Sequence, residues 1–233
     1  MNTLALIPAR GQSKRVPRKN LRDFLGMPLI AWSIRFAAAY PGFDRVVVST
    51  DSEEIAGAAR DAGIEVPDLR PGHLATDTAS SASVALWHVE QEAAAGRHYD
   101  AVALLQPTSP IRRPERWDEA FAIAADPQVD AVVGVRPVRD HPFHAFTRAE
   151  NGGLKRFLDH SDLSLRSQDL PPAYAVIGNL YLIKTAALRE RATFFPDRTA
   201  GVVCDAPDEA LDIDTEDDWM VAEAIVKHYA GAS

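Results

Sequence analysis

The sequence contains one cysteine, Cys204, among its 233 residues. A single cysteine excludes a disulfide within the chain and provides no pair of thiolates for a structural zinc site. Cys204 follows two valines in a strand-like run, which favours a small buried side chain over a reactive thiol. We therefore expect a protein of a reducing compartment, with 46% hydrophobic residues available for its core.

The sequence also lacks long hydrophobic runs and an excess of positive charge. No apolar run approaches the ~18 residues of a membrane span, and Pro8 and Arg10 come too early for a signal peptide. The formal net charge is -8, with 33 acidic and 25 basic residues. Because binding to nucleic acid or to an anionic membrane starts from a basic surface, neither partner is expected. We expect a cytoplasmic protein in which any bound polyanion meets a local basic site.

Several catalytic and nucleotide-binding motifs are missing as well. The chain has no G-x-S-x-G nucleophile motif, no Walker loop and no G-x-G-x-x-G of the dinucleotide folds. Its seven histidines are scattered, and only His141 and His144 lie close together, without cysteine partners. A zinc centre is therefore not expected.

What the chain does contain is an alternation of strand-like and helix-like segments. The apolar, β-branched runs are typical of strands buried on both faces, at 4–7, 45–49, 101–105 and 131–135. Segments with helical character and recognisable ends separate them, at 28–36, 50–63 and 78–96 and from 114 onward. Thr50 is the expected cap of the second helix, and Pro114 lies in the expected first turn of the fourth. This alternation predicts an α/β fold with a doubly wound, mainly parallel sheet.

The alternation stops between 137 and 174. His141-Pro142, Asn151-Gly152-Gly153 and Pro171-Pro172 interrupt a stretch with weak periodicity. We interpret this stretch as an inserted arm, and we assign 1–136 and 175–233 to one α/β domain. After the insertion, strands are expected at 177–183, 201–204 and 210–213, followed by a closing helix after Thr215.

The segment after the first strand carries a high concentration of positive charge. Six cations and no acid fall within thirteen residues, namely Arg10, Lys14, Arg15, Arg18, Lys19 and Arg22. Open α/β sheets bind ligands at the carboxyl ends of their strands, so this position favours a binding role over a solvated loop. Gly11 permits close approach of a ligand, and arginine and lysine suit phosphate oxygens. We therefore expect this basic loop, residues 10–22, to bind the phosphates of a nucleotide.

A pair of acidic residues near the end of the chain forms a second candidate site. On an extended chain Asp212 and Asp214 face one side, while Leu211 and Ile213 enter the core. Two converging carboxylates suit Mg²⁺, which takes its remaining ligands from waters and substrate phosphates. In the alternative interpretation the acids serve the N-terminus of the following helix. That alternative explains residues 216–218 better than it explains Asp212.

Two polar segments complete the set of candidates. Gln106 lies in a turn with two prolines, 106–110, and suits the hydroxyl or amide groups of a sugar, although the segment is equally explained as a rigid turn. Arg70 precedes a hydroxyl-rich helix start, 78–81, and helix N-termini bind anions. Helix capping accounts for one of these hydroxyls but not for both serines and Arg70.

Together these segments resemble the acylneuraminate cytidylyltransferase family, which includes the CMP-sialic acid synthetases and relatives acting on legionaminic or pseudaminic acid. The resemblance spans nearly the whole chain. It rests on three motifs: Ile7-Pro8-Ala9-Arg10-Gly11 with Pro17-Arg18-Lys19-Asn20, then Gln106-Pro107-Thr108-Ser109-Pro110, and finally Asp212-Ile213-Asp214-Thr215-Glu216. It implies a Rossmann-like fold whose small inserted arm, 137–174 in this chain, forms a homodimer.

The resemblance also implies roles for individual residues. CTP would be bound by Arg10, Gly11, Ser13, Lys14, Lys19, Asn20, Arg70 and Ser81. The sugar acid would be bound by Gln106, Thr108, Ser109, Arg166, Tyr181, Phe194 and Phe195. Within that set Gln106 and Arg166 would hold the sugar and its carboxylate, and the aromatic residues would form the apolar wall near its acyl group. Mg²⁺ would be held by Asp212 and Asp214, and the residues acting in catalysis would be Arg10, Lys19 and Asp212.

The implied reaction is attack of the anomeric hydroxyl of a 2-keto-3-deoxy sugar acid on the α-phosphorus of CTP, with pyrophosphate leaving. Such a displacement needs in-line positioning and charge neutralisation more than a covalent nucleophile. Because the 106–110 turn is intact, sialic or legionaminic acid is preferred over pseudaminic acid. The chain departs from the family pattern at Gln12, Arg15, His144 and Asn179, and these departures bear on the choice of sugar. The alternatives are a related nucleotidyltransferase using another nucleotide or sugar acid, such as Kdo, and a non-catalytic nucleotide-binding homologue.

Overall fold

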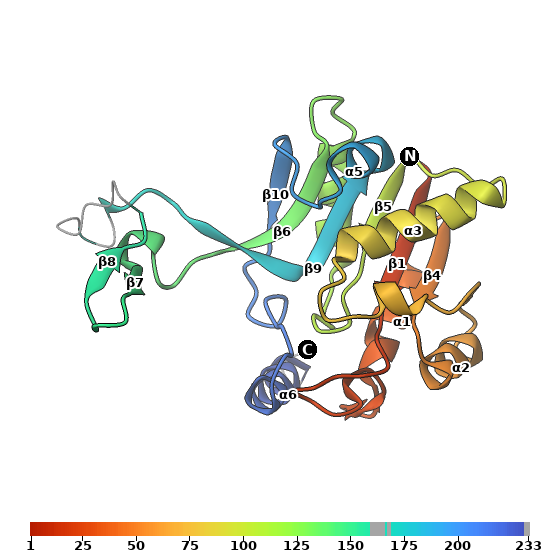
Figure 1. Ribbon diagram of the computed structural model, residues 1–233, viewed down its shortest axis with the longest axis horizontal. Helices are drawn as coiled ribbons and strands as arrows, with labels where there is room; N and C mark the ends of the chain where they lie inside the picture. The colour runs from red at the N-terminus through yellow and green to blue at the C-terminus, as the bar shows by residue number, and fades with distance from the viewer. Residues whose placement is uncertain (159–165, 167–168, 231–233) are drawn as a thin grey trace.

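The computed structural model describes residues 1–158, 166 and 169–230 and contains a six-stranded sheet in the order β10-β6-β9-β5-β1-β4 (Figure 1). The strands are β1 (Thr3–Pro8), β4 (Arg45–Ser49), β5 (Ala101–Leu104), β6 (Ala131–Pro137), β9 (Tyr174–Lys184) and β10 (Thr199–Val203). β9 runs antiparallel to β5 and β6, and the other neighbouring pairs are parallel. The predicted α/β fold with a mainly parallel sheet is therefore confirmed.

Helices cover both faces of the sheet. They are α1 (Leu29–Ala39), α2 (Glu53–Asp61), α3 (Ser81–Ala94), α4 (Pro114–Ala124), α5 (Thr185–Arg191) and α6 (Glu216–Ala230). α1, α2 and α4 share a buried cluster with Ile7 on one face, whereas α3 and α5 share a cluster with Leu6 on the other. Successive residues of β1 thus point to opposite faces and are buried on both, which explains the continuous apolar run. No helix in the described part of the chain combines the length and the apolar character that crossing a membrane needs.

The observed N-termini of α1, α2 and α4 can be compared with those predicted from the sequence. Pro28 lies at the N-cap of α1 and Pro114 in the first turn of α4, as predicted. The prediction that Thr50 caps α2 is wrong, because Ser52 is the cap and its Oγ accepts from the N–H of Ile55 at 3.5 Å. Thr50 instead accepts a hydrogen bond from the N–H of Ser52 at 3.1 Å. Threonine and serine are both common N-cap residues, so the sequence alone does not distinguish Thr50 from Ser52.

Ala210 lies in a turn and residues 211–213 do not join the sheet, so the strand predicted at 210–213 is wrong. The N–H of Ile213 donates to the carbonyl oxygen of Thr108 at 2.9 Å. Leu211 and Ile213 pack with Trp219 of α6 in a cluster separate from the two faces of the sheet. The alternating burial therefore comes from this packing, and Asp212 is still exposed between two buried residues, as the alternation indicates.

The N-terminal basic loop is held against the C-terminal helix. After the short helix η1 (Lys19–Leu21), β2 (Asp23–Phe24) and β3 (Met27–Pro28) form a small hairpin. The ring of Phe24 lies edge-on to that of Trp219, with centroids 5.4 Å apart, and the guanidinium of Arg22 lies 4.3 Å from the Trp219 ring. These contacts hold the end of the basic loop against α6.

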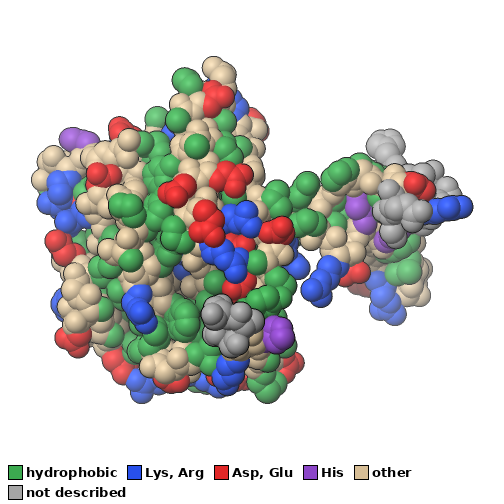
Figure 2. All heavy atoms as spheres, turned by 180° about the vertical axis from the view of Figure 1, so that it is seen from behind, with side chains coloured by type: hydrophobic (Ala, Val, Ile, Leu, Met, Phe, Trp, Pro, Cys, Tyr) green, Lys and Arg blue, Asp and Glu red, His purple; other side chains and the backbone are tan. Residues whose placement is uncertain are grey.

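Between β6 and β9 the chain leaves the body of the molecule as an arm (Figure 1). The outer ends of the two strands still pair, with Val135 opposite Val176 and Pro137 opposite Tyr174. Beyond them, η3 (Pro142–His144) leads to a hairpin of β7 (Phe146–Arg148) and β8 (Leu154–Arg156). Figure 2 shows the arm standing clear of the body, with hydrophobic side chains on its surface. That residues 137–174 form a subdomain of their own stays a prediction.

Candidate active site

A cleft of about 620 Å³ opens at the carboxyl ends of β1 and β5, where Pro8 and Gln106 line it. The predicted site residues in its lining are Arg10, Ser13, Lys14, Lys19, Asn20, Arg70, Ser81, Gln106, Thr108, Asp212 and Asp214. Residues outside the predicted set also line it, namely Pro8, Gln12, Arg15, Thr76, Asp77, Ala79, Val84 and Pro107. The fold therefore brings the basic loop, the Gln106 turn and the carboxylate pair to one cavity.

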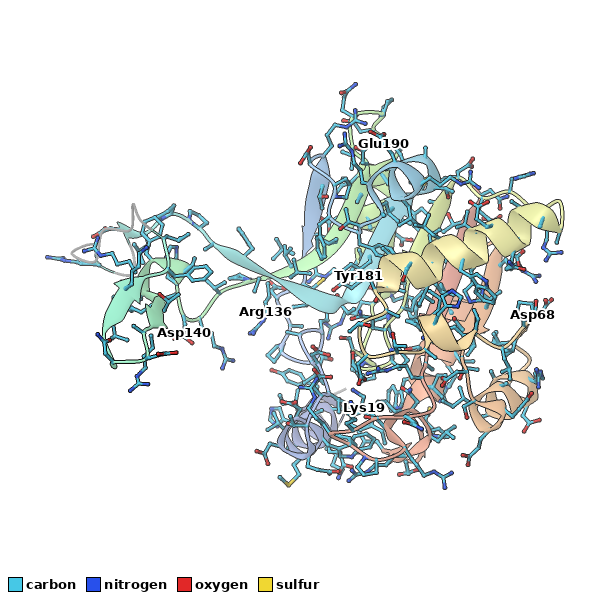
Figure 3. All side chains as sticks on the ribbon, in the orientation of Figure 1. Lys19, Asp68, Arg136, Asp140, Tyr181 and Glu190 are labelled. Atoms are coloured by element: carbon cyan, nitrogen blue, oxygen red, sulfur yellow. The ribbon has the colours of Figure 1, made fainter. Side chains whose placement is uncertain are left out.

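Lys19 joins the basic loop to the carboxylate pair. Its side chain is 13% exposed and lies between α6 and the edge of the sheet (Figure 3). Its Nζ donates to the carbonyl oxygen of Ile213 at 2.8 Å and to Oδ1 of Asp214 at 3.1 Å. Oδ2 of Asp214 accepts from Arg15 at 2.8 Å. Asp214 is thus neutralised by two cations of the loop.

Asp77, on the loop before α3, contacts the other side of the basic loop. Arg10 donates to Oδ1 of Asp77 at 2.6 Å, and Nζ of Lys14 lies 2.5 Å from Oδ2. Hydrogen bonds from Lys14 and then from Arg10 lower the pKa of Asp77. Asp77 is not among the predicted site residues. The signal that could have found it is a lone acid in a hydroxyl-rich segment, facing a loop that has no acid of its own.

Arg70 and Asn20 hold the backbone around the cleft as well as lining it. Arg70 is 6% exposed, and its guanidinium donates to the hydroxyl of Ser49 at 3.0 Å and to the Ser49 carbonyl oxygen at 2.5 Å. Burial lowers the pKa of Arg70, and the charge of Asp51 acts in the opposite direction. The side-chain amide of Asn20 donates to the carbonyl oxygen of Arg10 at 3.0 Å.

Gly11 lies behind the cleft, against the cap of α2. Its N–H donates to Oδ1 of Asp51 at 2.9 Å. A side chain at this position would place its Cβ 2.8 Å from Cβ of Ser52, closer than atoms of folded proteins approach. Packing against Ser52 therefore already requires glycine here. Contact of Gly11 with a nucleotide stays a prediction.

Three aromatic side chains assigned to the sugar pack together as an aromatic wall, but none of them is in the described lining of the cleft. Burial, and then the charge of Asp212, raise the pKa of Tyr181. The Tyr181 ring makes edge contacts with Phe194 and Phe195, with centroids 5.8 Å and 6.0 Å apart. Phe194 is buried, whereas Phe195 is 52% exposed. Contact of this wall with a sugar stays a prediction.

Ser109 and Arg166, also assigned to the sugar, are likewise outside the described lining of the cleft, which includes Gln106 and Thr108 of that set. Ser109 is 1% exposed, and its hydroxyl faces Gly178 of β9, whose Cβ would come within 2.4 Å of it. Arg166 is exposed and lies in the arm, which projects away from the body (Figure 1). A contact between Arg166 and a ligand in this cleft would therefore require the arm of a second chain.

Asp212 and Asp214 are the residues that could hold a metal ion. Both line the cleft, and Asp212 makes no hydrogen bond or ion pair with any other residue described in the structure. Across residues 1–158, 166 and 169–230, no three His, Cys, Asp or Glu side chains are grouped as metal ligands. Two carboxylates beside a basic cleft fit Mg²⁺, which accepts one or two protein carboxylates with phosphate oxygens and waters. They do not fit a metal held by protein ligands alone.

This arrangement suits transfer of a nucleotidyl group, because its cations can neutralise a triphosphate while its carboxylates hold a divalent cation. The family model described as Cytidylyltransferase matches residues 4–224. The chain belongs to the cytidylyltransferase family.

Named relatives are similar over most of the chain. The CMP-N,N'-diacetyllegionaminic acid synthase of Legionella pneumophila and a pseudaminic acid cytidylyltransferase of Campylobacter jejuni are each 34% identical over 227 residues, covering 97% of both chains. An N-acylneuraminate cytidylyltransferase of Streptococcus agalactiae is 33% identical over 223 residues, which are 94% of this chain and 52% of that protein. These names confirm the resemblance seen in the sequence.

Solved structures share the fold. A CMP:2-keto-3-deoxy-manno-octonic acid synthetase complexed with CTP superposes with a TM-score of 0.72 and 17% identity, covering 98% of this chain and 100% of that chain. A 4-diphosphocytidyl-2C-methyl-D-erythritol synthase from Anaerococcus prevotii superposes with a TM-score of 0.65 and 12% identity, covering 97% and 96% of the two chains. Likeness at this level of identity shows the Rossmann-like fold and nothing finer.

Proposed function

We propose that this cytidylyltransferase activates a nine-carbon 2-keto-3-deoxy sugar acid, of the sialic or legionaminic acid type, with CTP to give the CMP-sugar and pyrophosphate. The observation that carries the proposal is the meeting of the basic loop and the carboxylate pair in one cleft, where Lys19 and Asp214 are 3.1 Å apart. Relatives named for legionaminic acid and N-acylneuraminate support the choice of substrate, at 34% and 33% identity.

The chemistry follows from the charges in the cleft. The anomeric hydroxyl of the sugar loses its proton to solvent and its oxygen forms a bond to the α-phosphorus of CTP, while the bond from that phosphorus to the leaving pyrophosphate breaks. Arg10 and Lys19 neutralise the charge that develops on pyrophosphate, which lowers the barrier without a covalent intermediate. When bound by Asp212 and Asp214, Mg²⁺ would supply Lewis-acid neutralisation of the phosphates. Gln106 and the aromatic wall at Tyr181 would orient the sugar.

We further propose that the protein acts as a homodimer in which each arm reaches the cleft of the other chain. The position of Arg166 supports this arrangement, because the arm carries it away from the cleft of its own chain. Exposed apolar side chains on the arm also support it, with Leu154 66% and Phe157 63% exposed. Apolar surface that stands clear of the body is typical of a protein interface. A cytoplasmic location fits the single, buried cysteine.

A substrate panel tests the proposed function. The purified protein is incubated with Mg²⁺, each of the four common nucleoside triphosphates and each of several sugar acids, including sialic, legionaminic, pseudaminic and Kdo, and released pyrophosphate is measured. We expect turnover with CTP and with sialic or legionaminic acid. Turnover of another triphosphate but not CTP, or of Kdo alone, would overturn the proposal. Binding of CTP without turnover of any pair would instead favour a non-catalytic homologue.

Replacing Asp212 tests the metal assignment. We expect Asp212→Asn to lower kcat by about 100-fold or more, because the metal's charge neutralisation is lost, while CTP binding falls much less. The matched control is Asp217→Asn, which removes an exposed acid of the same segment that is not part of the described cleft lining. Steady-state kinetics and calorimetric CTP binding check both variants. Unchanged activity of Asp212→Asn would show that the metal assignment is wrong.

A further inference from the structure

Arg112 is a buried cation just beyond the Gln106 turn. It is 8% exposed, and its guanidinium forms no ion pair with a carboxylate in the described part of the chain. Burial lowers the pKa of Arg112 to about 9, so the side chain is still charged at neutral pH. Burying a charge without a counter-ion is costly, and an apolar side chain of similar size would fill the same space at lower cost. Packing alone therefore does not explain why a charged side chain occupies this buried position.

The guanidinium of Arg112 ties together three segments that are distant in the sequence. Nη2 donates to the carbonyl oxygen of Gln106 at 2.7 Å, and Nε donates to the carbonyl oxygen of Asn179 at 3.0 Å. Nη1 donates to the hydroxyl of Ser33 on α1 at 3.0 Å. A planar group with five N–H donors in fixed directions can serve all three acceptors at once, which lysine cannot do.

Both carbonyl groups lie where the sheet ladder is interrupted. Besides the bond from Arg112, the Gln106 carbonyl oxygen accepts one from the N–H of Ser109 within its own turn, at 3.1 Å. β6 and β9 change register between Val133 and Val135, which pair with Tyr181 and Val176, so residues 177–180 form a bulge opposite Gly134. Asn179 lies in this bulge. Gln106 lies beyond the last pair of β5 with β9, Leu104 opposite Tyr181. Arg112 thus donates to both carbonyl oxygens at the point where both strands stop pairing regularly.

The bulge also forms the floor beneath the Gln106 side chain. A Cβ on Gly178 would lie 2.8 Å from Oε1 of Gln106 and 2.4 Å from Oγ of Ser109. The side chains of the turn therefore rest directly on the glycine of the bulge. Any shift of the bulge relative to the turn would move Gln106 in the cleft that it lines.

We propose that Arg112 is a positioning residue for the sugar acid: it fixes the backbone of Gln106 against the bulge of β9 and so sets the direction of the Gln106 side chain. This inference rests on the proposed function. Arg112 acts through Gln106 and does not touch the cleft's ligands itself. Loss of the guanidinium should therefore weaken binding of the sugar acid more than binding of CTP, because the basic loop is held in place by other contacts.

Kinetics of Arg112→Lys test the proposal. We expect the KM of the sugar acid to rise about tenfold, and the KM of CTP to change less than about twofold, because charge-assisted hydrogen bonds to one substrate-orienting turn are lost. The control is Ser33→Ala, which removes the contact on the α1 side and should lower thermal stability without changing either KM. An unchanged sugar KM in folded Arg112→Lys, or equal changes in both KM values, would overturn the proposal.

A double-variant cycle separates positioning from general damage. Gln106→Ala removes the side chain that Arg112 positions. Adding Arg112→Lys to that variant should therefore change the KM of the sugar acid by less than about twofold. A full additional effect in that background would contradict the positioning role. If Arg112→Lys does not fold, Gly178→Ala provides a second test, because the added methyl group would displace the Gln106 side chain. We expect the KM of the sugar acid to rise and the KM of CTP to change little.

Hydrogen exchange provides a readout that does not depend on turnover. The N–H of Ser109 donates to the Gln106 carbonyl oxygen at 3.1 Å. In Arg112→Lys we expect faster exchange of peptides covering 106–110, with β1 peptides unchanged. Faster exchange throughout the protein, or no change at 106–110, would overturn the positioning role. The two proposals can fail separately. If the wild-type protein turns over no sugar acid, but Arg112→Lys still exchanges faster than wild type at 106–110, the proposed function is refuted and the structural role of Arg112 is retained.

Discussion

Two acids at the rim of the cleft compete with any anion for the basic loop. Asp77 binds Arg10 and Lys14, and Asp214 binds Arg15 and Lys19. The loop's charge repulsion is therefore relieved within the chain, and a triphosphate has to displace at least part of these contacts. The pairs made by Arg10, Lys14 and Arg15 are exposed and therefore contribute little to stability. Their influence on ligand affinity is the property that can be measured.

We expect Asp77→Asn to bind CTP about three- to tenfold more tightly at low salt, because Arg10 and Lys14 are then free of their internal counter-ion. The gain should shrink as ionic strength rises, since the contacts are exposed. Asp197→Asn is the control, because it removes an exposed acid elsewhere with the same change in net charge. Calorimetric titration with CTP at two salt concentrations checks both variants. Weaker CTP binding in Asp77→Asn would show that Asp77 contributes to the site instead of competing.

His88 of α3 gives the protein a pH-dependent stability. It is 1% exposed, and neither ring nitrogen has a hydrogen-bond partner in the described part of the chain. Burial, and then the charge of Arg70, lower the pKa of His88 to about 4, with Glu92 acting in the opposite direction. The unfolded chain titrates near 6.5, so between these values it binds more protons than the folded state. The free energy of unfolding therefore falls as the pH drops through this range.

We expect His88 to account for a loss of up to about 3 kcal/mol in the free energy of unfolding between pH 6.5 and pH 4. His88→Gln, which cannot be protonated in this range, should show a shallower fall over the same pH range. Urea unfolding of both proteins at intervals across the range measures the difference. Parallel curves for the two proteins would contradict a buried, neutral His88.

At the scale of elements, the sequence predicts what depends on local pattern. The strands around β1 and the starts of α1 and α4 follow from apolar runs and prolines, because burial on both faces and the fixed proline φ angle leave few alternatives. The strand expected at 210–213 fails because alternation of burial does not identify a pairing partner. α5 has no counterpart in the prediction, since seven residues give about two turns and too little periodicity.

The candidate site also contains residues that the sequence predicts and contacts that it does not. The rule that ligands bind at the carboxyl ends of the strands is sufficient to expect Lys19 and Gln106 in one place. Asp214 does not follow from that rule, because its segment lies outside the sheet and is positioned by packing of Leu211 and Ile213 with α6. The partners of Asp77 and Arg112 could not be predicted, because each contact joins segments brought together only by the tertiary fold. The bulge in β9 likewise depends on the insertion of that strand between β5 and β6.

The N-terminus of α3 borders the cleft, and its cap can be tested. Ser80 accepts a hydrogen bond from the N–H of Ser83 at 3.0 Å, while the Ser83 hydroxyl donates to the Ser80 carbonyl oxygen at 2.7 Å. We expect Ser80→Ala to lower the free energy of unfolding by about 1 kcal/mol, and Ser80→Asn to retain most of it because asparagine also caps helices. Urea unfolding measures both changes. Equal losses in the two variants would show that the cap is not the cause.

On the scale of the whole molecule, one strand connects the arm to the cleft. β9 starts in the arm's neck at Tyr174, passes the bulge at Asn179 and reaches Tyr181, which pairs with Leu104 of β5. Figure 3 shows Tyr181 in the body and Asp140 in the arm, on opposite sides of Arg136. β9 therefore joins the arm to the bulge beneath the Gln106 turn, whereas the basic loop contacts α6.

The proposed dimer makes a prediction about its surface. We expect a Leu154→Glu, Phe157→Glu double variant to be monomeric and folded, because it places charge on two arm residues that are 66% and 63% exposed in a single chain. Met220→Glu is the matched control, since Met220 on α6 is also 63% exposed. Light scattering after gel filtration gives the mass of each protein. A dimer that survives the double variant would show that these residues lie outside its interface.

Mixing two inactive variants tests whether the arms exchange between chains. If each cleft uses Arg166 from the partner, Asp212→Asn and Arg166→Ala chains are each inactive alone. A mixed dimer nevertheless contains one complete cleft, formed by Asp212 of the Arg166→Ala chain and Arg166 of the Asp212→Asn chain. Because half of the dimers in an equal mixture are mixed, and each has one working site, the mixture should recover about a quarter of wild-type activity. If Arg166 served its own chain, no dimer in the mixture would hold a complete cleft, and no activity would return.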